Sequence, residues 1–170
     1  SSVNFGSFQG VNMMFNSDLD GPAWGGSLYA TLDGVSRVWP VTWEPPWAYA
    51  DISVIAHEMG HGFGLPHSSY GTSNAYDNAW DVMSKDRYGC PPEDATYGCT
   101  GQHTIAYHKD LLGWIPSARK VAVPFGGSAT VTLERLAQPL TTDTRLVTVS
   151  AGTSDGKFFT VETRRRIGYD

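Results

Sequence analysis

Three histidines and a glutamate lie within one eleven-residue stretch of the chain, at positions that could bind and use a metal ion. The stretch is His57-Glu58-Met59-Gly60-His61-Gly62-Phe63-Gly64-Leu65-Pro66-His67, which matches the pattern H-E-x-x-H-x-x-G-x-x-H throughout. If its first half is helical, His57 and His61 lie one turn apart on one face. Two imidazoles at this spacing can bind one zinc ion, and Glu58 between them can act as general base on a water.

The third histidine, His67, can join the other two only if the chain bends. Six residues beyond His61, a continuing helix would carry His67 about 240° around the axis and about 9 Å along it. Gly64 can adopt the left-handed conformation that ends a helix, and Pro66 cannot continue one. The motif therefore holds three candidate ligands together with the bend that gathers them.

The residues around the motif predict a helix with one apolar face. Asp51 is a candidate N-cap, although Val54 leaves no capping box. Apolar side chains recur at helical spacing opposite the candidate ligands, so we expect them to pack against a hydrophobic core. These residues are Ile52, Ile55, Ala56, Met59 and Phe63.

Composition restricts the classes of function. The 170 residues carry a net charge of -5 and no apolar run of about 18 residues, so neither a nucleic-acid surface nor a membrane span is expected. No signal peptide follows Ser1, which fits a mature secreted chain as well as a cytosolic one. Few lysines and many Gly, Ser, Thr, Asn, Trp and Tyr residues favour an extracellular protein. Cys90 and Cys99 bracket a short loop and predict a disulfide; a second metal site lacks the Cys-x-x-Cys spacing.

The N-terminal part of the chain is expected to form strands and turns. Apolar runs cover residues 11–15, 27–32 and 38–43, and Asp33-Gly34 between the last two predicts a hairpin turn. Asp18, Asp20 and Gly21 resemble a fragment of a calcium loop. The remaining calcium ligands are absent, so a plain acidic turn is the preferred interpretation.

The later part of the chain changes from helical to alternating patterns. A short helix is expected over residues 104–112, ended by Gly113 and Pro116. Strands are expected at residues 129–133, 145–150 and 158–163, with turns at Gly126-Gly127 and Asp155-Gly156. The last strand ends shortly before Asp170, which fits a sheet that ends there and a chain cut from a longer protein.

With the extended zinc motif and a later methionine, the sequence resembles the metzincin clan of zinc endopeptidases. The resemblance implies that His57, His61 and His67 are ligands and that Glu58 is the general base. It also implies that Gly64 is the bend and that Met83, in Asp81-Val82-Met83-Ser84, is the Met-turn methionine beneath the metal.

Within the clan, residues 108–115 and the region reaching Gly168-Tyr169-Asp170 are similar to gametolysin-like and immune-inhibitor-like secreted peptidases. The immune-inhibitor group typically has Asp at the position of His67, so the gametolysin-like group fits better. Astacins and serralysins place a metal-reaching Tyr two residues after the Met-turn methionine. Lys85 occupies that position here, and Tyr88 is a nearby candidate.

The resemblance implies an α+β zincin fold with a mixed sheet, an active-site helix, and a lower subdomain that carries the Met-turn. Residues 1–116 would form the catalytic domain, its upper part about 1–67 and its lower part about 68–116. Residues 117–170 would form a β-rich module. The expected function is that of a secreted endopeptidase that uses one Zn²⁺ ion to hydrolyse protein or peptide substrates. A non-catalytic zinc-stabilised binding module and a zinc amidase for a non-peptide substrate remain alternatives, and no feature indicates an oligomeric state.

Overall fold

The structure is a computed structural model that describes residues 3–69, 76–84 and 93–165. The chain divides into two units, an N-terminal unit of residues 1–102 and a C-terminal unit of residues 103–170. Within the described ranges, each unit contains one mixed three-stranded sheet and one α-helix, so the chain is of the α+β class. The unit boundary precedes the second helix, whereas the sequence-based division places residues 103–116 in the first domain.

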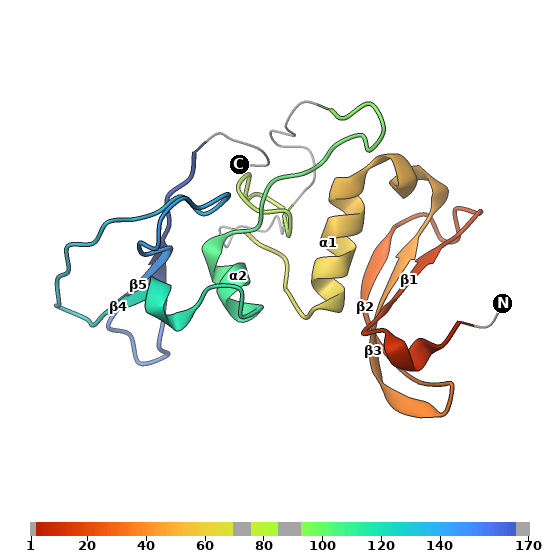
Figure 1. Ribbon diagram of the computed structural model, residues 1–170, viewed down its shortest axis with the longest axis horizontal. Helices are drawn as coiled ribbons and strands as arrows, with labels where there is room; N and C mark the ends of the chain where they lie inside the picture. The colour runs from red at the N-terminus through yellow and green to blue at the C-terminus, as the bar shows by residue number, and fades with distance from the viewer. Residues whose placement is uncertain (1–2, 70–75, 85–92, 166–170) are drawn as a thin grey trace. The chain divides into compact units, whose positions relative to one another are not determined.

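The sheet of the N-terminal unit consists of β1 (Val11–Met14), β2 (Trp24–Leu32) and β3 (Val35–Glu44), in the order β1-β3-β2. β1 pairs with β3 in parallel and β2 pairs with β3 antiparallel (Figure 1). Asp33 and Gly34 link β2 to β3 with φ angles of 49° and 75°, as a type I′ hairpin requires. The strands expected at residues 11–15, 27–32 and 38–43 and the hairpin turn at Asp33-Gly34 are therefore confirmed.

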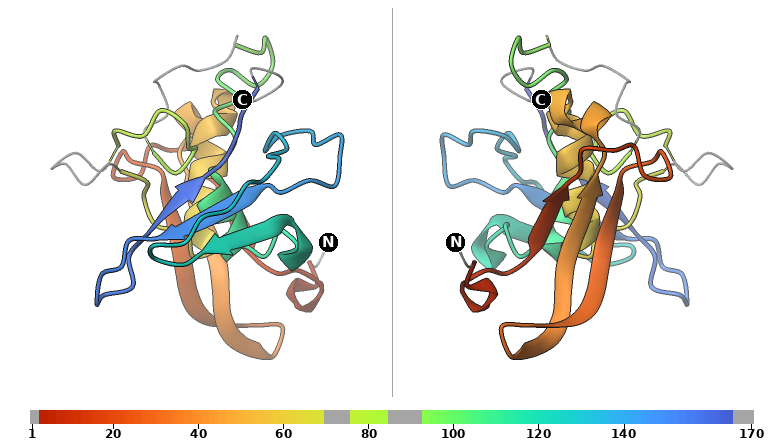
Figure 2. Two further views of the ribbon diagram at one scale, coloured as in Figure 1. Left: turned by 90° about the vertical axis from the view of Figure 1, so that its left-hand side faces the viewer. Right: turned by 90° about the vertical axis from the view of Figure 1, so that its right-hand side faces the viewer.

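Helix α1 (Ile52–Gly62) carries the first two histidines of the motif and packs against β2 and β3 (Figure 2, right). A short 3-10 helix, η2 (Pro46–Ala50), leads into it, and another, η1 (Phe5–Ser7), precedes β1. Asp51 caps α1 as expected, because its side chain accepts a hydrogen bond from the backbone N–H of Ser53 at 3.2 Å.

The residues through which α1 packs against the sheet differ from the predicted ones. Met59 and Phe63, expected in a core, are 40% and 50% exposed. Glycines make the contact instead: Gly25 of β2 lies against the backbone of Glu58, and Gly62 lies beside β3. Because glycine has no side chain, the helix backbone approaches the strands closely, and Met59 and Phe63 remain half-exposed in the wall of a pocket beside β1 and β3.

The C-terminal unit has its own sheet, in the order β4-β5-β6. β4 and β5 are parallel, and β5 and β6 are antiparallel (Figure 2, left). A core of Ala106, Ile115, Leu136 and Leu146 fills this unit. Its elements are α2 (Ala106–Leu111), η3 (Ser117–Arg119), β4 (Lys120–Val123), β5 (Leu146–Ser150) and β6 (Phe158–Val161).

Most elements of this unit match the sequence-based expectations, with one error and one omission. α2, β5 and β6 lie within the expected helix and strands, and turns occur at Gly126 and Gly156. The strand expected at residues 129–133 is wrong: apart from one isolated bridge at Leu133, this largely exposed segment has no ladder partner among the described residues. β4 was not expected, because four residues before a proline carry little periodic signal.

None of the described helices is long and apolar enough to span a bilayer.

We predict that Gly25→Ala destabilises the N-terminal unit by about 1–3 kcal/mol, because a Cβ there would overlap the carbonyl oxygen of Glu58 and force α1 off β2. Urea unfolding measures the change. Gly6→Ala is the matched control, since its Cβ would meet only the Asn4 and Val35 side chains, at 3.3 and 3.7 Å. Equal stability of the two variants would show that the close approach of α1 to β2 does not contribute to the stability of the unit.

Candidate metal centre

His57 and His61 lie one turn apart on α1, and their rings face each other. Their Nε2 atoms are 3.1 Å apart, and the ring planes are nearly perpendicular, at 86°. The ring of His67 lies 5.2 Å from that of His57 and 4.6 Å from that of His61. One ligand atom from each histidine can be chosen so that all three lie within 4.8 Å of one another. The structure thus brings together the three histidines that the motif singles out.

The chain reaches His67 through a bend directly after α1. Gly64 has a φ of 90°, in the region that favours glycine, and its N–H donates to the carbonyl of His61 at 2.9 Å. The N–H of Leu65 then donates to the carbonyl of Gly60 at 2.9 Å, and the Leu65 side chain is buried. These backbone bonds end the helix and direct the following segment back toward it.

Two hydrogen bonds determine which nitrogen of each helical histidine faces the centre. His57 Nδ1 bonds the carbonyl oxygen of Val82 at 2.7 Å, and His61 Nδ1 bonds that of Leu65 at 2.8 Å. A carbonyl oxygen only accepts, so each Nδ1 must be the donor, and we assign the tautomers on this basis. In the neutral rings both Nε2 atoms then carry lone pairs, and the two atoms lie 3.1 Å apart.

The separation of the two Nε2 atoms is close to the one that a shared metal ion would impose. Two unprotonated nitrogens at 3.1 Å repel each other, whereas two nitrogens bound to one zinc ion lie roughly 3.3 Å apart in tetrahedral geometry. Burial lowers the pKa of His57, which the hydrogen bond from its ring to Val82 only partly opposes. Burial, followed by the proximity of His61 and His57, also lowers the pKa of His67. Both shifts favour the neutral imidazole, which is the form that binds a metal.

The turn at residues 81–84 lies beneath α1 and supports the centre. Met83 is fully buried, with its sulfur against Gly60 of the helix. Asp81 accepts a hydrogen bond from the N–H of Met83 at 3.1 Å, and its own carbonyl accepts from Ser84 at 3.0 Å. Between them, Val82 presents the carbonyl that orients His57. The motif did not reveal this role of Val82, because the two residues are far apart in sequence.

Tyr76 is a further residue at the site that the sequence did not single out. Its ring lies 4.6 Å from that of His67 and 6.3 Å from that of His57. The local signal for Tyr76 was an aromatic side chain in an otherwise polar segment. Lys85 and Tyr88, which bear on the comparison with astacins, lie outside the described residues.

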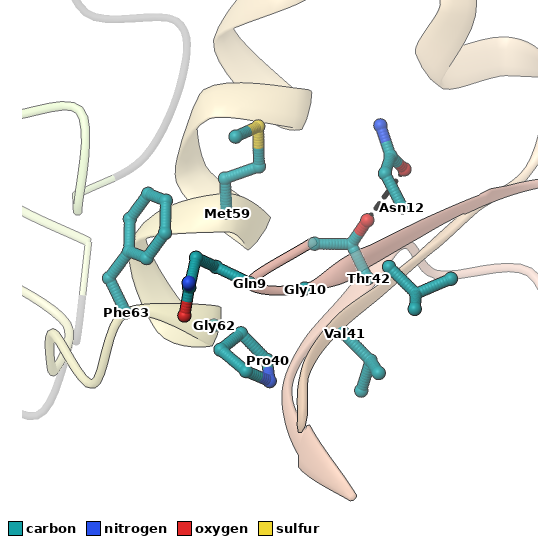
Figure 3. A pocket seen from close by; sticks show the side chains of 10 residues that line it. Gln9, Gly10, Asn12, Pro40, Val41, Thr42, Met59, Gly62 and Phe63 are labelled. Carbon is teal, nitrogen blue, oxygen red and sulfur yellow. Dashed lines mark hydrogen bonds between the residues drawn. The ribbon is translucent and has the colours of Figure 1, made fainter. Parts of the chain in front are cut away.

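Two cavities meet at the centre. The larger, of about 460 Å³, is lined by the three histidines, Glu58 and the start of β2 at Trp24 to Gly26. The smaller, of about 240 Å³, shares Ala23, His57, Glu58 and Tyr76 with it. Its other walls are Pro22, Trp47, Val54 and Ser84. A third pocket, of about 220 Å³, lies at Met59 and Phe63, away from the histidines (Figure 3).

Glu58 is a carboxyl group with an unusual environment beside the histidines. Burial raises its pKa to about 7, and a hydrogen bond from the backbone N–H of Gly25 opposes the shift. A second carboxyl group, Glu44 at the end of β3, is fully buried. Burial and then the nearby Glu58 raise the pKa of Glu44 to about 7, and the neighbouring Thr42 side chain opposes the shift.

The other expected sites lie elsewhere in the chain. Cys99 is disulfide-bonded, and its expected partner, Cys90, lies outside the described residues. Asp18 and Gly21 close a tight turn, in which the Gly21 N–H donates to the Asp18 carbonyl at 2.7 Å. Asp20 lies within this turn, as a plain acidic turn requires.

The three histidines are the one group of three or more candidate ligands within reach of a shared ion in the part of the chain that the structure describes. Comparison of the chain with known protein families, curated proteins and solved structures found no match. The function must therefore be inferred from the chemistry of its own residues.

We predict that Glu44→Gln makes the protein less sensitive to rising pH. The folded-state pKa of about 7 exceeds the usual 4.5, so Glu44 holds a proton in the folded chain that the unfolded chain has lost. Its contribution to stability is complete below pH 4.5 and is lost as the pH rises through 7. From pH 5 to pH 8, the stability of Glu44→Gln relative to the parent should rise by about 1–3 kcal/mol in urea unfolding.

Glu134→Gln is the control for this experiment. Hydrogen bonds, first from Thr141 and then from Arg135 and Leu140, lower the pKa of Glu134 to about 2. Its contribution is therefore present above pH 4.5 and constant from pH 5 to pH 8. A stability difference for Glu44→Gln that is equally constant over this range would contradict the assignment.

Proposed function

We propose that the chain is a zinc-dependent endopeptidase of the metzincin type. The observation that carries the proposal is the convergence of two Nε2 lone pairs, fixed by hydrogen bonds at Nδ1, beside a third histidine and a glutamate in an open cavity. A zinc site built only for structure is normally closed by a fourth protein ligand. The metzincin assignment rests on the sequence motif, the glycine bend at Gly64 and the methionine Met83 beneath α1.

In this proposal His57, His61 and His67 hold one zinc ion through ring nitrogens. When bound, zinc supplies Lewis-acid activation of a water molecule and of a substrate carbonyl. Glu58 accepts the proton that the water loses and passes it to the leaving amine. A pKa near 7 suits both halves of this role, because a carboxylate must take the proton and then release it at neutral pH.

The edge of the sheet supports an extended polypeptide as substrate. β2 is one of the two outer strands in the order β1-β3-β2, and its first residues, Trp24 to Gly26, line the cavity of the three histidines. An extended peptide can add to such an edge through main-chain hydrogen bonds, which places a scissile bond beside the ligands. The disulfide at Cys99 supports a secreted location, since such bonds persist in oxidising compartments.

We predict that Glu58→Gln lowers the cleavage rate of casein about 10²–10⁴-fold, because the amide cannot accept a proton. The variant should retain the fold and one zinc ion per chain, measured by circular dichroism and atomic absorption. Glu93→Gln, an exposed substitution of the same kind, should cleave casein like the parent. Parental activity in a zinc-loaded Glu58→Gln variant would exclude Glu58 as the general base.

We also predict that 1,10-phenanthroline abolishes cleavage and that added zinc restores it, because the chelator removes the ion that the three histidines hold. The isomer 1,7-phenanthroline, which cannot chelate, should leave the rate unchanged. Cleavage of a peptide library, run beside metal analysis, then separates the alternatives. Tight zinc binding without cleavage of any peptide would favour a zinc-stabilised binding module or an amidase for another substrate.

A further inference from the structure

Asn78 connects the segment that carries the third histidine to the turn beneath α1. Its side-chain Nδ2 donates to the hydroxyl of Ser68 at 2.6 Å, and its backbone N–H donates to the hydroxyl of Ser84 at 2.9 Å. Its side-chain oxygen accepts from the N–H of Trp80 at 3.0 Å, which fixes the orientation of the amide. Ser68 directly follows His67, and Ser84 directly follows Met83.

The same turn bonds His57 and the residue that follows His67. The N–H of Ser68 donates to the carbonyl of Met83 at 2.8 Å, beside the Val82 carbonyl that orients His57. The Asn78 bonds therefore run parallel to a backbone bond between the same two segments. Together they determine how far the His67 segment lies from the turn that holds His57.

These bonds are shielded from water. Ser68 and Ser84 are 7% and 1% exposed. Water cannot readily replace a hydrogen bond at such a position, so its loss leaves a buried polar group without a partner. A bond of this kind can restrain a short irregular segment that has no helix or strand of its own.

His67 needs such a restraint more than the other ligands do. His57 and His61 are held by α1 and by hydrogen bonds at Nδ1. His67 belongs to the segment of residues 65–69, which forms neither helix nor strand. Any freedom of this segment must be lost when the third histidine binds a metal, and that loss weakens binding.

We propose that Asn78 is a positioning residue of the metal centre, which holds His67 beside His57 and His61 through its bonds to Ser68 and Ser84. The proposal rests on the metal site of the proposed function and not on its peptidase activity. Residues that orient metal ligands typically change metal affinity 10–100-fold when they are replaced.

The first experiment measures zinc affinity by competition with a chromophoric chelator. Asn78→Ala should bind zinc about 10–100-fold more weakly than the parent. Asn12→Ala is the matched control: Asn12 accepts a hydrogen bond from the Thr42 hydroxyl, also at 2.6 Å, but joins β1 to β3 away from the histidines (Figure 3). Its zinc affinity should stay within about twofold of the parent, and equal affinities of all three proteins would overturn the proposal.

The second experiment tests whether Asn78 acts through His67. In the His67→Ala background, Asn78→Ala should cause little further loss of zinc affinity, because the ligand that it positions is gone. An equal loss with and without His67 would show a general effect on stability and overturn the proposal. The visible spectrum of the cobalt-loaded protein gives a second readout. In Asn78→Ala it should shift toward that of His67→Ala, and a parental spectrum would contradict the proposal.

Two further measurements keep the outcomes separate. Should Asn78→Ala not fold, the same double-mutant cycle with Ser68→Ala, which removes only the accepting hydroxyl, decides the question. A parent that binds no zinc would refute the proposed function itself. A parent that binds zinc but cleaves no peptide would refute the peptidase proposal and leave the role of Asn78 to be decided by zinc affinity.

Discussion

The proposed metal centre depends on the neighbouring Nε2 atoms of His57 and His61. Hydrogen bonds from each Nδ1 to a backbone carbonyl leave Nε2 as the lone-pair nitrogen of the neutral ring, and the two Nε2 atoms lie 3.1 Å apart. Two such lone pairs repel each other, and a cation bound between the rings would convert this repulsion into attraction. Because the unfolded chain has no such arrangement, metal binding and folding of the N-terminal unit are expected to be coupled.

Glycines let α1 satisfy two conflicting demands. The helix must present polar ligands to a cavity and also pack against a sheet. Gly25 and Gly62 bring the helix backbone close to β2 and β3, so little of the helix surface is used for packing. The close approach also surrounds Glu58 with protein, and burial raises the pKa of its carboxyl group to about 7. Tight packing and the acid–base character of Glu58 thus have one cause.

Local sequence information predicted that the three histidines come together, and it predicted several elements. The spacing of the histidines, the Asp51 cap and the Asp33-Gly34 turn each depend on residues close together in the chain. The orientation of α1 could not be predicted, because it depends on Gly25, which lies on another strand. The expected strand at residues 129–133 failed for a related reason: alternation makes a strand favourable, but a ladder also needs a partner.

The eleven-residue motif is therefore necessary for this centre but does not by itself determine it. His57 takes its orientation from Val82, and the segment after His67 is held by Met83 and Asn78. A chain with the motif but without the turn at residues 81–84 would leave the tautomer of His57 undetermined and the third ligand unrestrained. The motif supplies the nitrogens, and the turn determines which nitrogen of His57 faces the other two histidines. The buried turn is thus as much a part of the site as the histidines themselves.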